Sequence, residues 1–413
     1  MMRIHSVILS LLLLMIVCVQ PASAQKYNFR HFSSPALPDP VVYAVNQDNN
    51  GYIWVGTGTG LYRFDGFTFR KVDYPDKESI RFATVIMRDS RGTMWIGGSD
   101  GTMHFYNGIS LKAIDGIDAQ RINDIEEDSS GNIFAVTQNN GIYVISGKDK
   151  YIERHIKPTP GLLLYSLCFA GNDSILAGTN ENLLLVSAEA DSLDAGRIIP
   201  GIEYTKVSGI VPGKVSGLFY AGTEDYGIYI VSTAEGTYSA EPVSESEEML
   251  YLRVQSLYTD SEENLWVSTF GSGVIKFYFD ETGRKIFNQR NYDEMTGLAG
   301  NDARSVFNDV EGNIWIALYG QGLNQLVSEA FTFYQPGNSR DDNNVLYINK
   351  TGSEVFLGTP SGYHLFDLFT GMSKHFEPIQ RATSGVPASS YLTDRRGTIF
   401  IGTAGAGLFS KNG

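Results

Sequence analysis

One stretch of the sequence decides the fold: residues 42–69 read VYAVNQDNNGYIWVGTGTGLYRFDGFTF. Its turn signal is Asp48-x-x-Gly51, in which the Asp side chain can bond its own turn and the Gly can take a positive φ. An apolar run precedes this turn, and a second run around Trp54 follows it. Glycine-containing turns separate the later runs. The stretch therefore predicts four short antiparallel strands, at 41–45, 52–57, 60–64 and 67–72.

The same frame recurs through the chain, with one large residue at the centre of each second strand. All four tryptophans occupy that place, and the spacing between successive large residues is 39 to 49. A period of this length built only of strand signals is typical of β-propeller blades, and nine copies in one frame argue against a β-sandwich. We predict an all-β protein, a β-propeller of four-stranded blades, although the copies at 176 and 220 have degenerate turns. The large residues stand at positions 54, 95, 134, 176, 220, 266, 315, 356 and 400.

The N-terminus has the pattern of an export signal. Arg3 precedes an apolar run, and Ala22-Ser23-Ala24 is a small-residue cleavage site. We predict a cleaved signal peptide at 1–24 and a periplasmic mature chain without a membrane span, the alternative being an uncleaved anchor. A propeller of seven repeats is predicted at 25–336, and the start of a second, incomplete propeller, repeats 8 and 9, at 337–413.

The segment Phe29–Phe32 resembles the outer strand of the first repeat at 69–72. A propeller ring must close, because an open blade leaves a sheet edge unpaired. We therefore expect this segment to supply the fourth strand of a late blade. Two leftover blades would expose such edges, so we also expect the chain to associate unless a partner covers its C-terminal blades.

Charge and composition exclude several classes of function. The net charge of −14 gives no electrostatic footprint for nucleic acid and disfavours anionic lipid. Cys168 is the single cysteine outside the predicted signal, which excludes an intramolecular disulfide and predicts a buried, inert thiol.

The sequence contains no metal-ligand spacing, phosphate-binding loop or nucleophile elbow. We expect no catalytic residue, no metal and no cofactor. An enzyme built from carboxylates of distant blades, a lyase or a glycosidase, stays open, as does a protein-interaction scaffold.

The first strand of each blade lines the channel of a propeller, and the turn after the second strand lies at the same end. Five residues before each turn Asp the side chain is mostly polar, where a buried strand would carry Val or Ile. Aromatic rings beside amides and one Arg suit a sugar, because rings stack on its apolar face and amides bond its hydroxyls. The alternative is that these residues only face channel water. The strand positions are Tyr43, Thr84, Asn123, Gln255, Arg304 and Ser389, and the turn positions are Asp100, Asn139, Phe270, Tyr319 and Gln321. We predict ligand binding by Tyr43, Asn123, Gln255, Phe270, Arg304 and Tyr319.

The motif Asp-x-x-Gly-x-Ile-Trp-Val-Gly-Thr-x-x-Gly-Leu, read from Asp48 to Leu61, closely resembles the two-component regulator propeller repeat. That repeat occurs in the periplasmic sensor half of hybrid two-component systems, mostly of Bacteroides-type bacteria. The resemblance implies two consecutive seven-bladed propellers, and glycans or their oligosaccharide products as ligands. It also implies a β-sandwich, a membrane helix and a histidine kinase, none of which lies in these 413 residues.

The resemblance thus predicts a ligand-sensing input propeller without transmitter activity in this chain. Its small-molecule ligand is expected to be glycan-derived. Its signal is expected to pass by contact, to a separate sensor kinase or through self-association. No nucleic-acid partner is expected.

Overall fold

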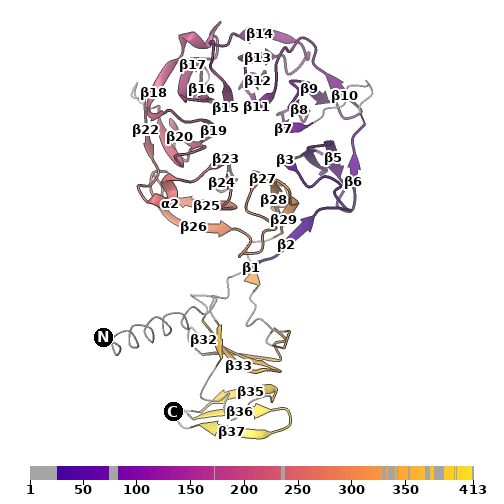
Figure 1. Cartoon of the computed structure of the whole chain (residues 1–413), viewed down its shortest axis with the longest axis vertical. Helices are drawn as coiled ribbons and strands as arrows, with labels where there is room; N and C mark the ends of the chain where they lie inside the picture. Colours follow the sequence, from indigo (N-terminus) through magenta and orange to yellow (C-terminus); the bar gives the residue numbers. More distant parts are fainter. Residues whose placement is uncertain are drawn as a thin grey trace, which may run out of the picture. The chain divides into compact units, whose positions relative to one another are not determined.

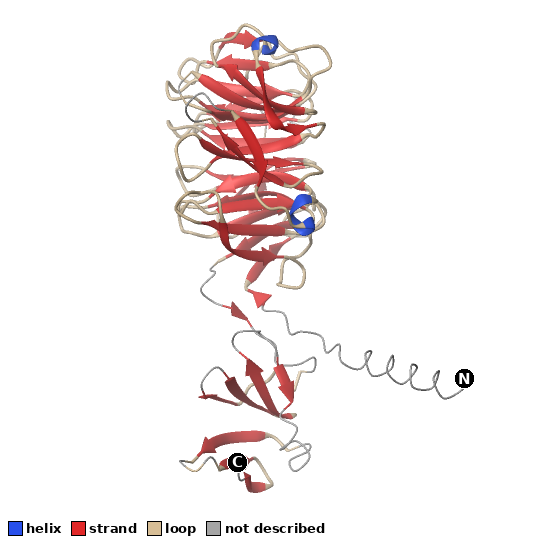
Figure 2. Ribbon diagram, turned by 90° about the vertical axis from the view of Figure 1, so that its left-hand side faces the viewer, coloured by secondary structure: helices blue, strands red, loops and turns tan. Residues whose placement is uncertain are grey.

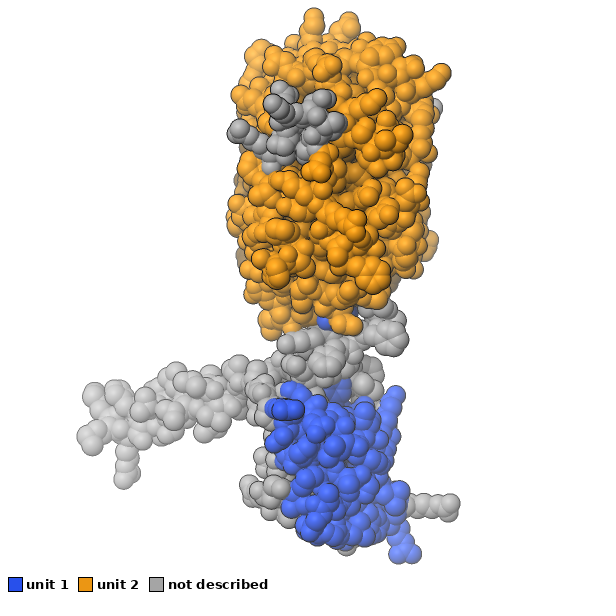
Figure 3. Space-filling model, turned by 90° about the vertical axis from the view of Figure 1, so that its right-hand side faces the viewer, with its two compact units in different colours: residues 1–27, 330–413 blue, residues 28–329 orange. Residues whose placement is uncertain are grey.

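The computed structural model divides the chain into two compact units, Asn28–Glu329 and Met1–Tyr27 with Ala330–Gly413 (Figure 3). The predicted signal peptide and the predicted boundary at 336 lie outside the described residues. The structure describes residues 26–73, 82–171, 173–233, 238–327, 332–333, 340–341, 343–351, 354–367, 373–375, 386–394, 396 and 398–411.

The described residues of unit 28–329 form seven four-stranded antiparallel sheets, numbered here as blades 1 to 7 in chain order (Figures 1 and 2). In every blade the first strand is innermost and each following strand lies further out. Blade 1 is β3 (Val42–Gln47), β4 (Ile53–Thr57), β5 (Gly60–Phe64) and β6 (Phe69–Lys71). Blade 2 is β7 (Ala83–Arg88), β8 (Met94–Gly98), β9 (Met103–Tyr106) and β10 (Leu111–Ala113). Blade 3 is β11 (Ile122–Glu127), β12 (Ile133–Thr137), β13 (Ile142–Ile145) and β14 (Ile152–Ile156).

The degenerate copies of the repeat, blades 4 and 5, form sheets of the same order. Two short helical turns, η1 (Leu193–Ala195) and α2 (Glu247–Leu250), lie between strands and were missed because such short segments contain no helical period. Blade 4 is β15 (Leu164–Phe169), β16 (Ser174–Thr179), β17 (Asn182–Ser187) and β18 (Arg197–Glu203). Blade 5 is β19 (Val207–Pro212), β20 (Leu218–Thr223), β21 (Ile228–Ser232) and β22 (Ser239–Pro242). Blade 6 is β23 (Val254–Thr259), β24 (Leu265–Thr269), β25 (Val274–Phe279) and β26 (Ile286–Tyr292).

Blade 7 joins the two ends of the ring. Its inner strands are β27 (Ala303–Asn308), β28 (Ile314–Leu318) and β29 (Gly322–Leu326), and its outer strand is β2 (Phe29–Phe32) from the start of the chain. Phe29 pairs with Leu326 and Phe32 with Leu323. β27 also contacts β3 of blade 1, so the ring is closed. The prediction that the segment at 29–32 completes a late blade is confirmed.

A hydrogen-bonded latch explains why Asp and Trp recur together in the repeat. In blade 1 the Asp48 carboxylate accepts backbone N–H groups from Asn50 and Tyr52, which closes the hairpin turn. Its second oxygen accepts the indole N–H of Trp54 at 2.8 Å. We call this arrangement the Asp–Trp latch. The same indole bond occurs in blades 2, 6 and 7, between Trp95 and Asp89, Trp266 and Asp260, and Trp315 and Asp309.

The core lies between neighbouring blades. Trp54, which is fully buried, packs with Ile86 and Met94 of the next blade. The motif glycine permits this close approach, since a Cβ at Gly56 would lie 2.4 Å from the carbonyl oxygen of Ala83. Apolar burial between sheets is therefore the main force that holds adjacent blades together.

The other unit holds the eighth and ninth copies of the repeat. Its large residue Phe356 stacks on Tyr391 with ring centroids 4.1 Å apart. The described residues thus fit one ring of seven blades followed by two further sheets, and the β-propeller prediction is confirmed. In this unit β1 (Lys26–Tyr27) pairs with β30 (Thr332–Phe333). One sheet is β31 (Tyr347–Thr351), β32 (Glu354–Thr359), β33 (Gly362–Asp367) and β34 (Ser373–His375), and the other is β35 (Ala388–Thr393), β36 (Ile399–Thr403) and β37 (Gly407–Lys411).

Candidate functional site

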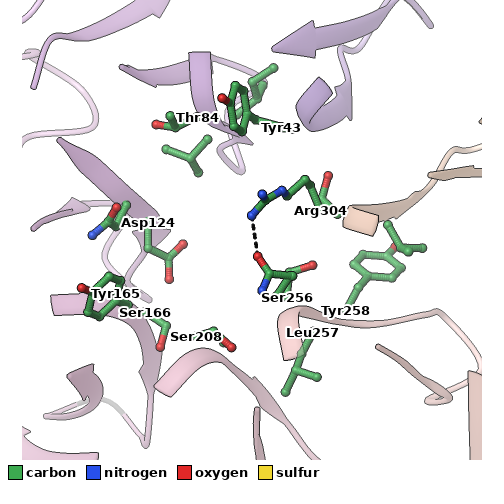
Figure 4. A pocket seen from close by; sticks show the side chains of 18 of the residues that line it. Tyr43, Thr84, Asp124, Tyr165, Ser166, Ser208, Ser256, Leu257, Tyr258 and Arg304 are labelled. Carbon is green, nitrogen blue, oxygen red and sulfur yellow. Dashed lines mark hydrogen bonds between the residues drawn. The ribbon is translucent and has the colours of Figure 1, made fainter. Parts of the chain in front are cut away.

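A cavity of about 430 Å³ occupies the channel of the ring, and all seven innermost strands contribute to its wall. Figure 4 shows labelled side chains reaching toward it from different blades, among them Tyr43, Asp124, Tyr165 and Arg304. The end at which the first strands begin is called the channel mouth here.

A β-bulge in each first strand aims one side chain into this cavity. In blade 1 the ladder pairs Val42 with Thr57 and Ala44 with Gly56, so Tyr43 has no partner residue. A bulge re-aims the side chain of its extra residue, and every bulge residue of the ring lines the cavity. The bulge residues of blades 1 to 7 are Tyr43, Thr84, Asn123, Tyr165, Ser208, Gln255 and Arg304.

The sequence missed two of these bulge residues, Tyr165 and Ser208. Counting back from the turn Asp fails in blades 4 and 5, where the Asp-x-x-Gly turn is degenerate. Tyr165 stands eleven residues before Leu176, as Tyr43 stands eleven before Trp54, so counting from the large residue would have found it. Ser208 stands twelve before its large residue and needed the structure.

Several bulge residues use their polar groups to join one blade to the next. The Thr84 hydroxyl donates to the carbonyl of Ile122 at 2.8 Å. In the same way Asn123 Nδ2 donates to the Leu164 carbonyl at 2.6 Å, and the Ser208 hydroxyl to the Val254 carbonyl. These bonds satisfy backbone carbonyls at the channel wall. Asn123, a predicted ligand residue, therefore lines the cavity but already uses one amide N–H within the fold.

Cations and tyrosines meet at the channel mouth. We call Tyr43, Arg121, Tyr165, Lys206 and Arg304 the mouth cluster, and all five line the cavity. Arg121 and Lys206 each stand two residues before a bulge residue, a position that the sequence reasoning did not consider. Burial lowers the pKa of Arg121 and of Lys206, and it raises the pKa of Tyr43 and Tyr165.

The three cations of the mouth cluster have different partners. Lys206 Nζ lies 4.5 Å from the Tyr165 ring centroid and 3.7 Å from the Glu224 carboxylate. Arg304 donates a hydrogen bond to the Gln255 side-chain carbonyl, shown dashed in Figure 4. Among the described residues, no side chain or backbone group forms a hydrogen bond or ion pair with the Arg121 guanidinium.

Two carboxyl groups lie deeper along the channel on β11. Burial raises the pKa of Asp124 to about 6, although the backbone N–H groups of Leu167 and Ile125 oppose the shift by bonding its carboxylate. Burial, and then the charge of Asp124, raise the pKa of Glu126 well above its ordinary value. Burial and these two carboxyl groups also raise the pKa of the Cys168 thiol, so the predicted buried and unreactive thiol fits the structure.

The predicted ligand residues separate into two groups. Tyr43, Gln255 and Arg304 line the cavity, and Tyr319, just after β28, extends the group. Its ring lies 6.4 Å from that of Tyr43, and the Arg304 guanidinium lies 4.7 Å from it. Phe270 does not line the cavity and stacks with Arg253 at 4.6 Å instead.

The remaining candidate positions contribute less. Ser389 is the bulge residue of β35 in the other unit, and the Asn139 side chain accepts the backbone N–H of Gln120. In the described part of the chain, no group of three or more His, Cys, Asp or Glu is placed to hold a metal ion. Nor does any helix there have the length and apolar character needed to cross a membrane.

Comparison with known families identifies the repeat in one segment of the chain. Residues 36–59 match the model of the two component regulator propeller, so the chain carries the repeat of that family, in agreement with the resemblance drawn from its motif. No curated protein matches the chain.

Solved structures agree on the fold. The extracellular domain of a proposed hybrid two component system from B. thetaiotaomicron is 18% identical with a TM-score of 0.72. That match covers 94% of this chain and 53% of the other, so this chain spans about half of its length. A proposed one component system from B. thetaiotaomicron matches at 14% identity and a TM-score of 0.56, covering 94% and 59%. Virginiamycin B lyase from Staphylococcus aureus, also 14% identical, has a TM-score of 0.58 over 73% of this chain and 99% of its own. At such identities the likeness extends to the fold alone.

Proposed function

We propose that this chain is an extracytoplasmic sensing module whose seven-bladed ring binds a carbohydrate or oligosaccharide at the channel mouth. One observation carries the proposal: aromatic rings and hydrogen-bond donors from blades 1, 4 and 7 surround one cavity. Tyr43 and Tyr165 offer ring faces, and Arg304 offers a planar set of donors. The family of the repeat and the fold of the matching extracellular domains support a sensing role.

The proposed mode of signalling is contact. A separate sensor kinase or a second copy of the chain is the proposed receiver of the signal. Light scattering on the chain with and without bound saccharide tests the second arrangement. A ligand-dependent change in mass supports self-association, and an unchanged mass directs the search to a separate kinase.

Calorimetry with single variants tests the binding site. An oligosaccharide found to bind the full chain is titrated into the parent, Tyr319→Ala and Phe270→Ala. Both aromatic residues follow a second strand and stack with an Arg, but Tyr319 alone of the two contacts cavity-lining residues. We expect Tyr319→Ala to weaken binding about tenfold and Phe270→Ala to bind like the parent. Equal effects of the two variants would place the ligand elsewhere.

A second function, catalysis, is favoured by one observation, the carboxyl groups of Asp124 and Glu126 in the channel wall. Their pKa values are raised by burial, as general acids require. Glycoside hydrolysis uses one protonated and one ionised carboxyl group on either side of the bond. Prolonged incubation of the bound saccharide with the chain, followed by chromatography of the products, separates the two functions. Cleavage that is lost in Glu126→Gln supports the enzyme, and intact saccharide supports the sensor.

A further inference from the structure

The channel mouth holds three positive charges in a chain that is strongly acidic overall. Arg121, Lys206 and Arg304 all line the cavity, although the net charge of the chain is −14. Among the described residues, the carboxylate that pairs with one of these cations is that of Glu224, which lies 3.7 Å from Lys206. The two guanidinium groups have no carboxylate partner in that part of the chain.

These cations repel one another in a partly desolvated place. Beyond burial, the charge of Arg304 lowers the pKa of both Arg121 and Lys206, and the charge of Arg121 lowers that of Lys206 as well. Grouped like charges with little solvent destabilise the folded state unless an opposite charge accompanies them. Such an arrangement is explained more readily by binding than by folding.

The carboxyl groups deeper in the channel do not neutralise the mouth. The oxygens of Asp124 already accept backbone N–H groups from Ile125 and Leu167. Burial raises the pKa of both Asp124 and Glu126, which disfavours the negative charge of these groups in the channel. The mouth therefore keeps an excess of positive charge.

Unused donors point to where an anion would bind. Arg304 Nε is buried without a hydrogen-bond partner, and Figure 4 shows its guanidinium group directed into the cavity. The Arg121 guanidinium has no hydrogen-bond partner among the described residues. A guanidinium group can bind a carboxylate or a sulfate through two parallel hydrogen bonds.

We propose that the saccharide bound at the channel mouth is anionic, and that its carboxylate or sulfate group is bound by Arg121 together with Lys206 and Arg304. This inference rests on the proposed function, because it names the class of ligand for the same cavity. Tyr43 and Tyr165, whose phenol groups lie within the electrostatic reach of Arg121, flank the bound group and contact the sugar ring.

Small anions test the charge site without knowledge of the full ligand. Sodium sulfate or sodium glucuronate replaces sodium chloride at constant ionic strength, and the thermal midpoint of the full chain is measured. We expect either anion to raise the midpoint of the parent by a few degrees and to leave that of Arg121→Gln unchanged. Arg253→Gln is the matched control, because Arg253 also stands two residues before a bulge residue but does not line the cavity. Lys206→Gln serves as a second variant should Arg121→Gln not fold.

Paired saccharides then distinguish carboxylate from sulfate. Calorimetry compares trigalacturonate with its methyl ester, and a sulfated chondroitin disaccharide with its desulfated form. We expect the charged member of at least one pair to bind at least tenfold more tightly, and Arg121→Gln to remove that advantage. Selectivity within the first pair identifies a carboxylate ligand, and selectivity within the second a sulfate.

The two proposals fail in different ways. If sulfate and glucuronate leave the parent midpoint unchanged, or if charged and neutral sugars bind equally, the anion site is overturned while saccharide binding stands. If small anions stabilise the parent through Arg121 but no saccharide binds, the anion site stands and the carbohydrate function is overturned.

Discussion

Blades 1, 2, 6 and 7 have the Asp–Trp latch, and blades 4 and 5 do not, yet the three inner strands have the same order in all six sheets. Blade 4 places Leu176 where blade 1 places Trp54, and both side chains are fully buried. Blade 5 uses Tyr220, whose hydroxyl donates to the carbonyl of Gly283 at 2.7 Å. The bulge that forms the channel wall is present in both kinds of blade.

This difference separates two roles of the repeat. The apolar pattern of the strands specifies the sheets and their packing, and it is kept in every blade. The latch adds local stability to a hairpin that can close without it, as backbone bonds close the turns of blades 4 and 5. The Asp and Trp of the motif therefore show where a blade lies in the sequence, but a blade also forms without them.

Removing a latch carboxylate is the strongest way to test this separation. Asp89 is buried, and its carboxylate accepts hydrogen bonds from the indole N–H of Trp95 and from two backbone N–H groups. It also forms an ion pair with Lys150, whose Nζ lies 3.7 Å away. We expect Asp89→Ala to lower the free energy of unfolding by about 3–5 kcal/mol, because it leaves buried donors and a cation without their partner. Urea unfolding followed by tryptophan fluorescence measures it, since all four tryptophans lie in the ring.

The control for this prediction is Asp173→Ala in blade 4. Asp173 lies in the corresponding turn but is exposed. We expect a change within about 0.5 kcal/mol, as for other exposed sites. If the two variants were equally stable, the latch would contribute nothing to the free energy of unfolding, and its presence would not distinguish blade 2 from blade 4 in stability.

Blade 3 differs from the others in the chemistry of its first strand, and this predicts a pH dependence. Asp124 and Glu126 have raised pKa values in the folded chain, so folding takes up protons there. Their contribution to stability is full below about pH 4 and falls as the pH rises through the raised pKa values, that of Asp124 being about 6. We expect Glu126→Gln to be more stable than the parent at pH 8 by about 1–2 kcal/mol, and to match it near pH 4.

The same unfolding assay at both pH values measures this effect. Glu127→Gln, on the same strand, is the matched control. The Glu127 carboxylate pairs with Arg91 and accepts hydrogen bonds from Ser90, so its replacement is expected to give no gain at pH 8. A gain of Glu126→Gln that did not depend on pH would show that the charge of Glu126 is not its cause.

The sequence predicted the repeat, the strand order and the closure by residues 29–32 because each depends on local patterns of apolar residues and turns. It also placed Tyr43, Gln255 and Arg304 in the channel, since a fixed count from the turn Asp finds the bulge residue. It could not reveal that the Asn123 side chain donates a hydrogen bond to the Leu164 carbonyl of the next blade, because this bond depends on packing between distant segments. The sequence did not predict Arg121 and Lys206 for a similar reason. These residues, from blades 3 and 5, are brought to the same cavity only when the ring closes. Blade 5 also lacks the Asp-x-x-Gly turn from which the bulge positions were counted.

The bulge residues allow the finest comparison between latched and unlatched blades. In blade 2 the Thr84 hydroxyl bonds the Ile122 carbonyl of the next blade, whereas no described group forms a hydrogen bond with the Tyr165 hydroxyl of blade 4. We expect Thr84→Val to cost about 1 kcal/mol, the usual contribution of one hydrogen bond, and Tyr165→Phe to cost less than about 0.5 kcal/mol. Because both variants keep a side chain of similar size in the channel wall, the difference between them isolates the bond between blades.

The saccharide affinity should respond in the opposite order, with Tyr165→Phe weakening binding more than Thr84→Val. This order is expected because the tyrosine hydroxyl is available to bond the ligand, whereas the threonine hydroxyl bonds the next blade. A loss of stability in Tyr165→Phe as large as that in Thr84→Val would mean that blade 4 also depends on its bulge side chain, and that binding and folding are not divided between these positions.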